Sequence, residues 1–460
     1  MNFDKGSFRD PAGKIFYHLN KVYRLVSSSG KNRISFLLKQ DLIHRSHQNN
    51  FLIKSKILEN NDILKLDLDK ESLVIEHEKI PYISYPYEWS FSQLKTAALH
   101  HIDFHLFLLD NDATLIDASA YNIQFIGSNP IFIDLLSIKK YEEGEYWYGH
   151  KQFCENFLNP LILSSKKGVQ FNNWFKGNLE GIPTNELNNL LNFFDKFSYN
   201  IFVNVYLLNK FDNKYKNHDK KIDISFKRKF PKQNFISLLN QLKNFIKDLK
   251  QKKITTVWEN YSSSNTYKES EEKEKAIIVK SFIDKNILPN VIDLGCNDGF
   301  YSEIAMKNNT NYITGFDYDP ISIDRAFIKF GNKQQNFLPL IFDATNPSAN
   351  IGWNEKERKS FNQRANFDGL LALAFEHHLA IAKNIPLDEA INWLISLAPK
   401  GLIEFVPKSD ETIQKMLKFK GDIFPDYNED NFKNIIEKKA NIISIKEITS
   451  SGRKIYQYER

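Results

Sequence analysis

The stretch Val291–Glu303, VIDLGCNDGFYSE, places an apolar run, an acidic residue and two glycines within thirteen positions. The apolar run predicts a buried strand, and Gly295 and Gly299 predict a tight turn after it. The residues that follow predict the start of a helix. A strand, a glycine turn and a helix in this order let a ligand come close to the backbone, because glycine has no side chain to block it.

Two common glycine loops do not fit this turn. A phosphate-binding loop needs a lysine directly after its last glycine, and Phe300 follows Gly299 instead. A dinucleotide loop beginning at Gly295 needs glycines at its third and sixth positions, which are Asn297 and Phe300. The pattern that remains is Asp293, Gly295 and Gly299. It indicates a ligand that approaches the backbone closely without being held by a diphosphate.

Around this turn the sequence alternates between strand and helix periodicity, which predicts an α/β fold with a parallel, doubly wound sheet. The last two strands flank the turn TSSGR and predict an antiparallel hairpin. Strands are expected at 290–295, 312–317, 337–344, 367–374, 401–406, 440–448 and 453–460, and helices at 274–287, 300–308, 320–331 and 388–398. The Ser-rich, charged stretch before them marks a boundary. We expect an α+β accessory domain at 1–253, a linker or cofactor lid at 254–275 and the α/β domain at 276–460.

The turn and two later acids resemble the motifs of class I S-adenosylmethionine-dependent methyltransferases. The resemblance implies a Rossmann-like sheet of seven strands with an antiparallel final hairpin, and S-adenosylmethionine as the cofactor. It implies that the turn holds the methionine part, that Asp317 binds both ribose hydroxyls and that Asp343 meets the adenine amino group. The sequence departs from the family at Asn297, which stands where a glycine is usual. The expected cofactor-binding residues are Asp293, Gly295, Asn297, Gly299, Asp317, Asp343 and, from the lid, Tyr261 and Tyr267.

Candidates for catalysis follow the fourth strand, where doubly wound sheets bind substrates. Glu376, His377 and His378 stand there, and histidine can take a proton near neutral pH. On an extended loop the two imidazoles would point to opposite sides, so we expect His378 to be the base and His377 to pack beside the cofactor. The alternative is that both histidines are structural. Glu404 and Lys408, after the fifth strand, are expected either to face substrate or to form a surface ion pair.

The first half contains its own pattern of chemically active residues. Asp117, Asn122 and Asp134 resemble the catalytic loop and metal-binding residue of the protein-kinase and aminoglycoside-phosphotransferase superfamily. In a live kinase of this type Asp117 would be the base, and Asn122 with Asp134 would hold magnesium. The preceding residues supply an opening hairpin, a hinge and a long helix, but no glycine-rich loop and no Val-Ala-x-Lys strand. We therefore expect a degenerate kinase-like scaffold and no metal site. The alternative is an accessory domain in which Asp117 and Asn122 brace a loop.

The arrangement of the two halves resembles bacterial nodulation-related methyltransferases. It does so in FRDPAG, YPYEWSFSQLK, DASAYNIQF and KQFCENFLNPL of the first half and in GCNDG and EFVPKSD of the second. We expect a methyltransferase that acts on an oxygen or nitrogen atom of an unidentified acceptor, with the first half recognising the substrate. The alternatives are a bifunctional kinase–methyltransferase acting on a small molecule or glycan, and a non-catalytic protein that binds S-adenosylmethionine. The loop after the fourth strand lacks the Asn/Asp-Pro-Pro-Tyr sequence of enzymes that methylate amides or adenine.

Composition limits the partners and the compartment. The net charge is +6, but residues 210–253 carry 14 Lys and Arg against 4 Asp and Glu, a local excess of +10 that leaves −4 elsewhere. This segment has few arginines and scattered aromatics, so we favour a small molecule, glycan or lipid over nucleic acid as partner. Only two cysteines, Cys154 and Cys296, occur, and no apolar signal segment or membrane span is evident. We expect a cytoplasmic protein.

Overall fold

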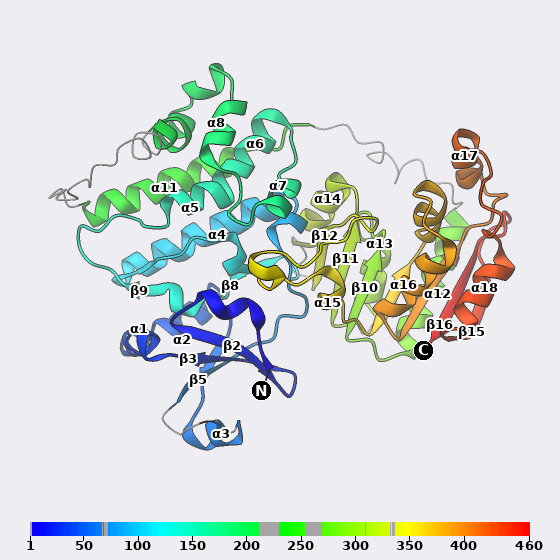
Figure 1. Cartoon of the computed structure of the whole chain (residues 1–460), viewed down its shortest axis with the longest axis horizontal. Coiled ribbons are helices and arrows are strands. Elements are labelled where there is room, and N and C mark those ends of the chain that lie inside the picture. Colours follow the sequence, from blue (N-terminus) through cyan, green and yellow to red (C-terminus); the bar gives the residue numbers. More distant parts are fainter. Residues whose placement is uncertain are drawn as a thin grey trace.

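The fold is taken from a computed structural model of the 460-residue chain. It describes residues 2–66, 68, 72–210, 230–253, 269–308, 310–331, 333 and 336–460. Figure 1 shows a mainly helical region above a small sheet in the first half of the chain, and a larger sheet beside both in the second half. Within the described residues, no helix is both long and apolar enough to cross a membrane.

The second half is built on a seven-stranded sheet in the order β12-β11-β10-β13-β14-β16-β15. β16 is antiparallel to both of its neighbours, and the remaining pairs are parallel. This order, with one antiparallel strand inserted next to an edge, is the Rossmann-like sheet expected from the sequence. The strands are β10 (Asn290–Leu294), β11 (Tyr312–Asp317), β12 (Phe337–Ile341), β13 (Gly369–Ala372), β14 (Lys400–Phe405), β15 (Asn441–Glu447) and β16 (Lys454–Glu459).

The helices of the second half connect these strands. They are α12 (Glu269–Lys285), α13 (Phe300–Met306), α14 (Pro320–Gly331), α15 (Phe361–Arg364), α16 (Leu387–Leu397), α17 (Glu411–Lys420) and α18 (Glu429–Glu437). α12 begins earlier than the sequence indicates. Its first turns lie in the expected linker, and Lys275, the last linker residue by that estimate, is buried against the sheet domain. The sequence analysis missed these first turns because they are rich in charged residues, and nothing in the sequence distinguishes the buried Lys275 from a solvent-exposed lysine.

The first half has a five-stranded antiparallel sheet in the order β1-β2-β3-β5-β4, and two small antiparallel pairs, β6 with β9 and β7 with β8. The expected opening hairpin is confirmed as β2 and β3. The strands are β1 (Asn2–Phe3), β2 (Gly13–His18), β3 (Lys21–Val26), β4 (Ser55–Ile57), β5 (Leu73–His77), β6 (Ala113–Leu115), β7 (Ile123–Ile126), β8 (Asn129–Phe132) and β9 (Ile138–Lys140).

Among the described residues of the first half, the longest helix is the one expected before Asp117. It is α4 (Phe91–Asp110), which starts with a capping box between Ser90 and Gln93 and packs against α11. The other helices are α1 (Ser28–Lys39), α2 (Leu42–Gln48), α3 (Asn60–Lys65), α5 (His150–Phe153), α6 (Asn159–Lys167), α7 (Asn172–Gly177), α8 (Thr184–Leu190), α9 (Tyr199–Ile201) and α11 (Lys232–Asp248). Whether the whole first half is kinase-like stays a prediction.

The two halves share one apolar core. Tyr82 of the first half lies edge-on to Phe316 at 5.5 Å and stacks on Phe367 at 5.8 Å, between ring centroids. Phe125 meets Phe327 of α14 at 5.7 Å in the same edge-on manner. All of these rings are buried. The halves are therefore joined by packing like that of a protein interior, and not by a polar surface contact.

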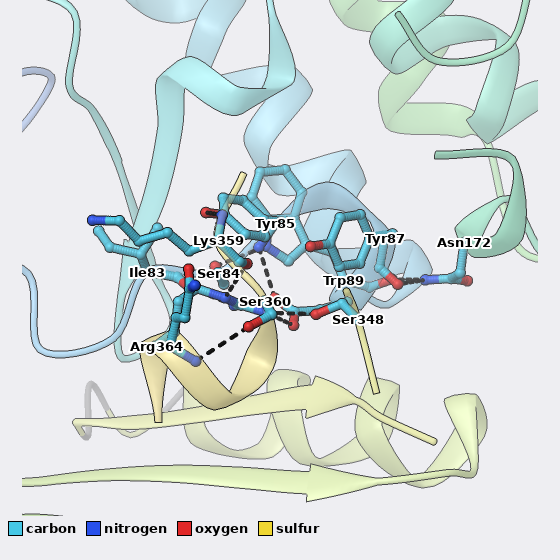
Figure 2. Close-up of polar contacts among 12 residues, drawn as sticks. Ile83, Ser84, Tyr85, Tyr87, Trp89, Asn172, Ser348, Lys359, Ser360 and Arg364 are labelled. Atoms are coloured by element: carbon cyan, nitrogen blue, oxygen red, sulfur yellow. Dashed lines mark hydrogen bonds and ion pairs between the residues drawn. The ribbon is translucent and has the colours of Figure 1, made fainter. Parts of the chain in front are cut away.

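A buried ion pair lies at the same junction. The Arg364 guanidinium at the end of α15 forms two hydrogen bonds with the Glu88 carboxylate, at 2.6 and 2.9 Å, and each side chain is only 3% exposed. Its other three N–H groups donate to the carbonyls of Ile83 and Lys359 and to the Ser348 hydroxyl. All five donors are thus used. Figure 2 shows Arg364 and Lys359 reaching the segment from Ile83 to Trp89.

This geometry predicts that Glu88→Gln will strongly destabilise the protein. The substitution keeps the shape but leaves the buried Arg364 charge without a counter-charge, which costs about 3–5 kcal/mol of unfolding free energy. Urea denaturation measures the loss. The matched control is Glu76→Gln, which breaks the exposed pair with Lys21 and should cost at most about 1 kcal/mol. Equal losses in the two variants would contradict the role given to Arg364.

Candidate active site

The glycine turn after β10 uses backbone conformations that its sequence explains. Gly295 and Gly299 have φ of +76° and +82°, in the left-handed region that favours glycine. Asn297, which replaces the usual glycine, has φ of +49°, and asparagine tolerates this conformation better than most residues. The departure at Asn297 therefore preserves the shape of the turn. A side chain at Gly299 would also collide with Phe330 and Phe337, at 2.7 and 2.9 Å from its Cβ.

Asp293 supports the turn from below. Its carboxylate is 3% exposed and accepts a hydrogen bond from the Ser302 hydroxyl of α13 at 2.6 Å. Burial raises the pKa of this carboxyl to about 6. Asp293 therefore fixes the start of α13 relative to β10, and it does not line the cavity described next.

Asp317 at the end of β11 faces the turn. Its Oδ2 accepts a hydrogen bond from the Asn297 N–H at 2.9 Å, and its Oδ1 accepts one from the Asp319 N–H at 2.9 Å. Burial raises the pKa of Asp317 to about 6, although both hydrogen bonds favour the carboxylate. Each oxygen keeps a further lone pair, so the carboxylate can still accept from a pair of neighbouring hydroxyls.

These residues border a cavity of about 350 Å³ at the carboxyl edge of the sheet. Five of the residues singled out from the sequence line it: Gly295, Asn297, Asp317, Asp343 and His378. Gly299 and Asp293 lie behind its wall and shape the turn. Tyr261 and Tyr267 lie outside the described residues, so their place in the lid stays a prediction.

The sequence analysis missed the apolar walls of this cavity. They include Phe316, Phe342, Phe375 and Leu379, and Phe375 lies 3.1 Å from where a side chain at Gly295 would begin. Two of the missed residues directly precede acids that were singled out, Asp317 and Asp343. Phe316 and Phe342 could therefore have been found from the sequence by their position directly before an acid at the end of a strand. The cavity combines flat apolar surfaces with carboxylates at two of its corners.

We expected the two imidazoles to point to opposite sides of an extended loop, and this prediction was wrong. Their ring centroids lie 4.2 Å apart, because the chain turns at His377 and continues as a short π-helix, His378–Ala382. His378 lines the cavity, whereas His377 is 1% exposed and does not. Burial lowers the pKa of His378 to about 4 and that of His377 well below its usual value. Both imidazoles are therefore neutral at physiological pH.

Glu376 is buried behind the histidines and does not line the cavity. Its Oε1 accepts a hydrogen bond from the Val406 N–H at 3.0 Å, and both of its oxygens lie within 3.1 Å of the Tyr427 hydroxyl. That hydroxyl also lies 2.7 Å from the Val406 carbonyl, which can only accept. One hydroxyl hydrogen cannot serve every acceptor. If Glu376 is protonated, it donates to the Tyr427 hydroxyl, and that hydroxyl donates to the Val406 carbonyl. Burial raises the pKa of Glu376 to about 8, which agrees with this arrangement.

A second buried network replaces the substrate contacts expected of Glu404. Glu404 is fully buried and pairs with Lys275 of α12 at 2.6 Å, while Arg453 binds Asp410 at 2.7 Å and lies 3.8 Å from Glu404. Lys408 pairs with Asp422 at the surface instead, so the alternative of a surface ion pair between Glu404 and Lys408 is not found. The Glu404 network ties α12 to β14, so its role is structural.

The acids of the first half lie in a separate place. Asp134 binds the Arg24 guanidinium of β3 at 2.7 Å, and Asp117 lies in the same cleft with Asn122. Among the described residues, no group of three or more acidic, histidine or cysteine side chains has an arrangement that could hold a metal ion. Arg24 places a positive charge beside Asp134.

Comparison with known proteins gives one relative that spans nearly the whole chain. The nodulation protein NoeA of Rhizobium meliloti (strain 1021) is 42% identical over 458 residues, which cover 99% of this chain and 95% of that protein. No family model matches the chain. Among solved structures, the N-methyltransferase NodS of Bradyrhizobium japonicum WM9 matches 42% of this chain and 97% of its own, with 10% identity and a TM-score of 0.31.

A second solved structure is the magnesium protoporphyrin IX methyltransferase ChlM of Synechocystis PCC 6803 with bound S-adenosylhomocysteine. It matches 48% of this chain and 94% of its own, with 16% identity and a TM-score of 0.30. Because these sequence identities and TM-scores are low, the fold is assigned from the order and direction of the strands in the sheet of this chain.

The state of Glu376 predicts a pH-dependent effect of Glu376→Gln. Its pKa of about 8 in the folded protein exceeds its usual value, so the folded state keeps a proton that the unfolded chain has lost. The unfolding free energy of the native protein therefore falls as pH rises through this range. Glutamine resembles the protonated acid and cannot ionise. We expect Glu376→Gln to gain stability over the native protein between about pH 5 and pH 8, by on the order of a few kcal/mol.

Chemical denaturation at both pH values measures this gain. Glu389→Gln, at an exposed site of α16, serves as the control and should change stability equally at both. A constant difference between Glu376→Gln and the native protein across the range would show that Glu376 is ionised in the fold.

Proposed function

We propose that this chain, which belongs to the family of the nodulation protein NoeA, is a methyltransferase that acts in nodulation. Its donor is S-adenosylmethionine and its acceptor atom is an oxygen or a nitrogen. The observation that carries this proposal is the convergence of Gly295, Asn297, Asp317 and Asp343 on one cavity at the carboxyl edge of the sheet. Acids at the ends of two neighbouring strands, beside a glycine turn, suit a nucleoside that carries no diphosphate.

The residues present fit this cofactor. Asp317 has lone pairs left for two ribose hydroxyls, and Asp343 at the end of β12 suits an exocyclic amino group. The rings of Phe316 and Phe342 and the side chain of Leu379 suit a flat base. The absence of side chains at Gly295 leaves room for the methionine part next to the backbone. Tyr261 and Tyr267 would cover the cofactor from the segment before α12.

The bound cofactor supplies a methyl group on a positively charged sulfur, which is already an activated leaving group. The protein has two tasks that its own residues perform. The turn at Gly295–Gly299 and the aromatic walls hold the donor in one orientation, so that the acceptor can approach in line. The apolar lining, with Phe375 and Leu379, keeps water from the reacting centre.

His378 is the group that can take a proton from the acceptor. It lines the cavity and is neutral at physiological pH, so one of its two ring nitrogens carries no proton. Protonation of His378 is confined to pH values below the usual range of histidine. His377 and Glu376, which lie behind it, position the turn and do not reach the acceptor. Lys383 also lines the cavity and stands at its exposed edge.

The first half recognises the acceptor in this proposal. Its core is continuous with that of the second half, and Arg358 and Glu357 from the second half line a cleft in the first. The direct test is incubation of the purified protein with methyl-labelled S-adenosylmethionine and fractionated lysate. Label in a small-molecule, glycan or lipid fraction supports the proposal. Tight cofactor binding without label in any fraction would favour a non-catalytic binding protein.

The cofactor site predicts the effect of Asp317→Ala. Removing the acceptor of two buried hydroxyls costs about 1.5–3 kcal/mol, or roughly 10- to 100-fold in affinity. Calorimetry with S-adenosylhomocysteine measures the loss. Asp388→Ala, at an exposed position of α16, is the control and should bind normally. An unchanged dissociation constant for a folded Asp317→Ala protein would remove Asp317 from the site.

The proposed base predicts a split between turnover and binding. With an acceptor in hand, His378→Asn should lower turnover by about 100-fold or more while cofactor affinity hardly changes, because the lost interaction belongs to the transition state. His377→Asn should instead lower the melting temperature. Full turnover by His378→Asn would mean that alignment alone drives the transfer.

A further inference from the structure

The first half contains a cleft that shares no lining residue with the candidate cofactor cavity. It consists of two adjoining cavities, of about 470 and 340 Å³, which share Arg24, Tyr121 and Arg358 in their walls. We call them the outer and inner cavities of the N-terminal cleft. They lie between the five-stranded sheet and the segment that carries Asp117, Asn122 and Asp134.

The outer cavity is polar but nearly balanced in charge. Four arginines and five acids line it: Arg9, Arg24, Arg33, Arg358, Asp10, Asp117, Asp134, Glu180 and Glu357. Three ion pairs are already formed among them: Arg9 with Glu357 at 2.6 Å, Arg24 with Asp134 at 2.7 Å and Arg24 with Asp10 at 3.5 Å. A site for a polyphosphate needs an excess of positive charge, and this cavity has none. Its charges suit a ligand without net charge.

Several hydrogen-bond donors around the cleft are not used within the described part of the protein. They are the Tyr121 hydroxyl, the Arg24 Nε and the Arg358 Nε. Tyr121 and Arg24 are each only 7% exposed, so their unused donors are buried and costly unless a ligand or water meets them. They come from three separate segments of the chain. The residues that carry these donors all line the outer cavity, as the residues of a binding site must.

Acceptors stand directly beside these donors. The Asn122 amide is close enough to Asp117 to lower the pKa of that carboxyl, while burial raises it. Asp117 uses Oδ1 for the Ser119 N–H, and Asp10 uses Oδ1 for the Ala12 N–H, and both carboxylates line the outer cavity. A hydroxyl group both donates and accepts. Neighbouring hydroxyls between a carboxylate and an amide satisfy both kinds of group at once.

The inner cavity has a different lining. Val22, Ile53, Ile80, Ile83 and Ile133 supply most of its apolar wall, together with the ring of Tyr17. A ligand that fills both cavities therefore carries hydroxyls at one end and an apolar group at the other.

We propose that the N-terminal cleft binds an uncharged, polyhydroxylated ligand of the sugar class, with its ring in the outer cavity and an apolar substituent in the inner one. Asp117 and Asn122 bind adjacent hydroxyls, and Tyr121 and Arg358 donate to ring or glycosidic oxygens. The site includes Arg358 of the second half, so the two halves build it together. The proposal does not depend on methyl transfer.

The test uses the full chain without cofactor and a panel of 4-nitrophenyl glycosides in the gluco, galacto, manno and N-acetylglucosamine configurations. Calorimetry at millimolar concentration should detect binding, tighter than that of the corresponding free sugars because the aryl group enters the inner cavity. Tyr121→Phe and Asn122→Ala should each weaken binding roughly 3- to 15-fold. Tyr121→Phe removes only a hydroxyl that is unused within the described protein, so folding should be preserved.

The matched control is Tyr141→Phe, which removes a buried hydroxyl outside the cleft and should leave affinity within about twofold. Three results would overturn the proposal. They are no binding by any glycoside of the panel, binding that neither cleft variant weakens, and magnesium-dependent ATP binding that is lost in Asp134→Asn. Affinity for S-adenosylhomocysteine, measured on the same variants, should stay unchanged and reports separately on the cofactor site.

Discussion

The bond between Arg364 and Glu88 is the constraint on which the arrangement of the two halves depends. A guanidinium that is 3% exposed survives only if every donor and its charge are matched. Here the match needs Glu88 and Ile83 from the first half and Ser348 and Lys359 from the second. The rings of Tyr82 and Tyr85 lie 5.1 and 4.4 Å from the guanidinium carbon and close the site to water. A displacement of one half relative to the other would leave the Arg364 charge buried without its partners.

One segment connects this bond to the candidate active site. The chain leaves β12 at Asp343 in the wall of the cofactor cavity, passes Arg358 in the N-terminal cleft, and ends at Arg364. The proposed nucleoside site and the proposed sugar site therefore border the same stretch of about twenty residues. The ion pairs of Lys359 with Asp4 and of Glu357 with Arg9 also tie it to the first ten residues of the chain. The first half is thus part of the frame of the cofactor cavity.

The sequence predicted the second half well because its signals are local. Period-two and period-3.6 patterns give the strands and helices, and the resemblance to methyltransferase motifs, which are short stretches of sequence, singled out Asp317 and Asp343. What it missed depends on contacts between distant residues. Lys275 was placed in the linker and Glu404 was expected to face substrate or to form a surface ion pair, yet each is buried because the other is there. The histidine pair read as an extended loop because nothing in HHLAIA indicates the π-helical turn that brings the rings together. Arg24 was overlooked because only the fold places β3 against Asp134.

The ion pair at the junction also constrains the order of events during synthesis. Glu88 and Arg364 are 276 positions apart, so at about 5–20 residues per second the ribosome adds the arginine roughly 14–55 s after the glutamate. During that interval the aromatic segment around Tyr82–Trp89 has neither its counter-charge nor the rings of Phe316 and Phe367 to pack against. Synthesis of this protein therefore imposes a delay, set by its chain length, before the interface between the two halves can be completed.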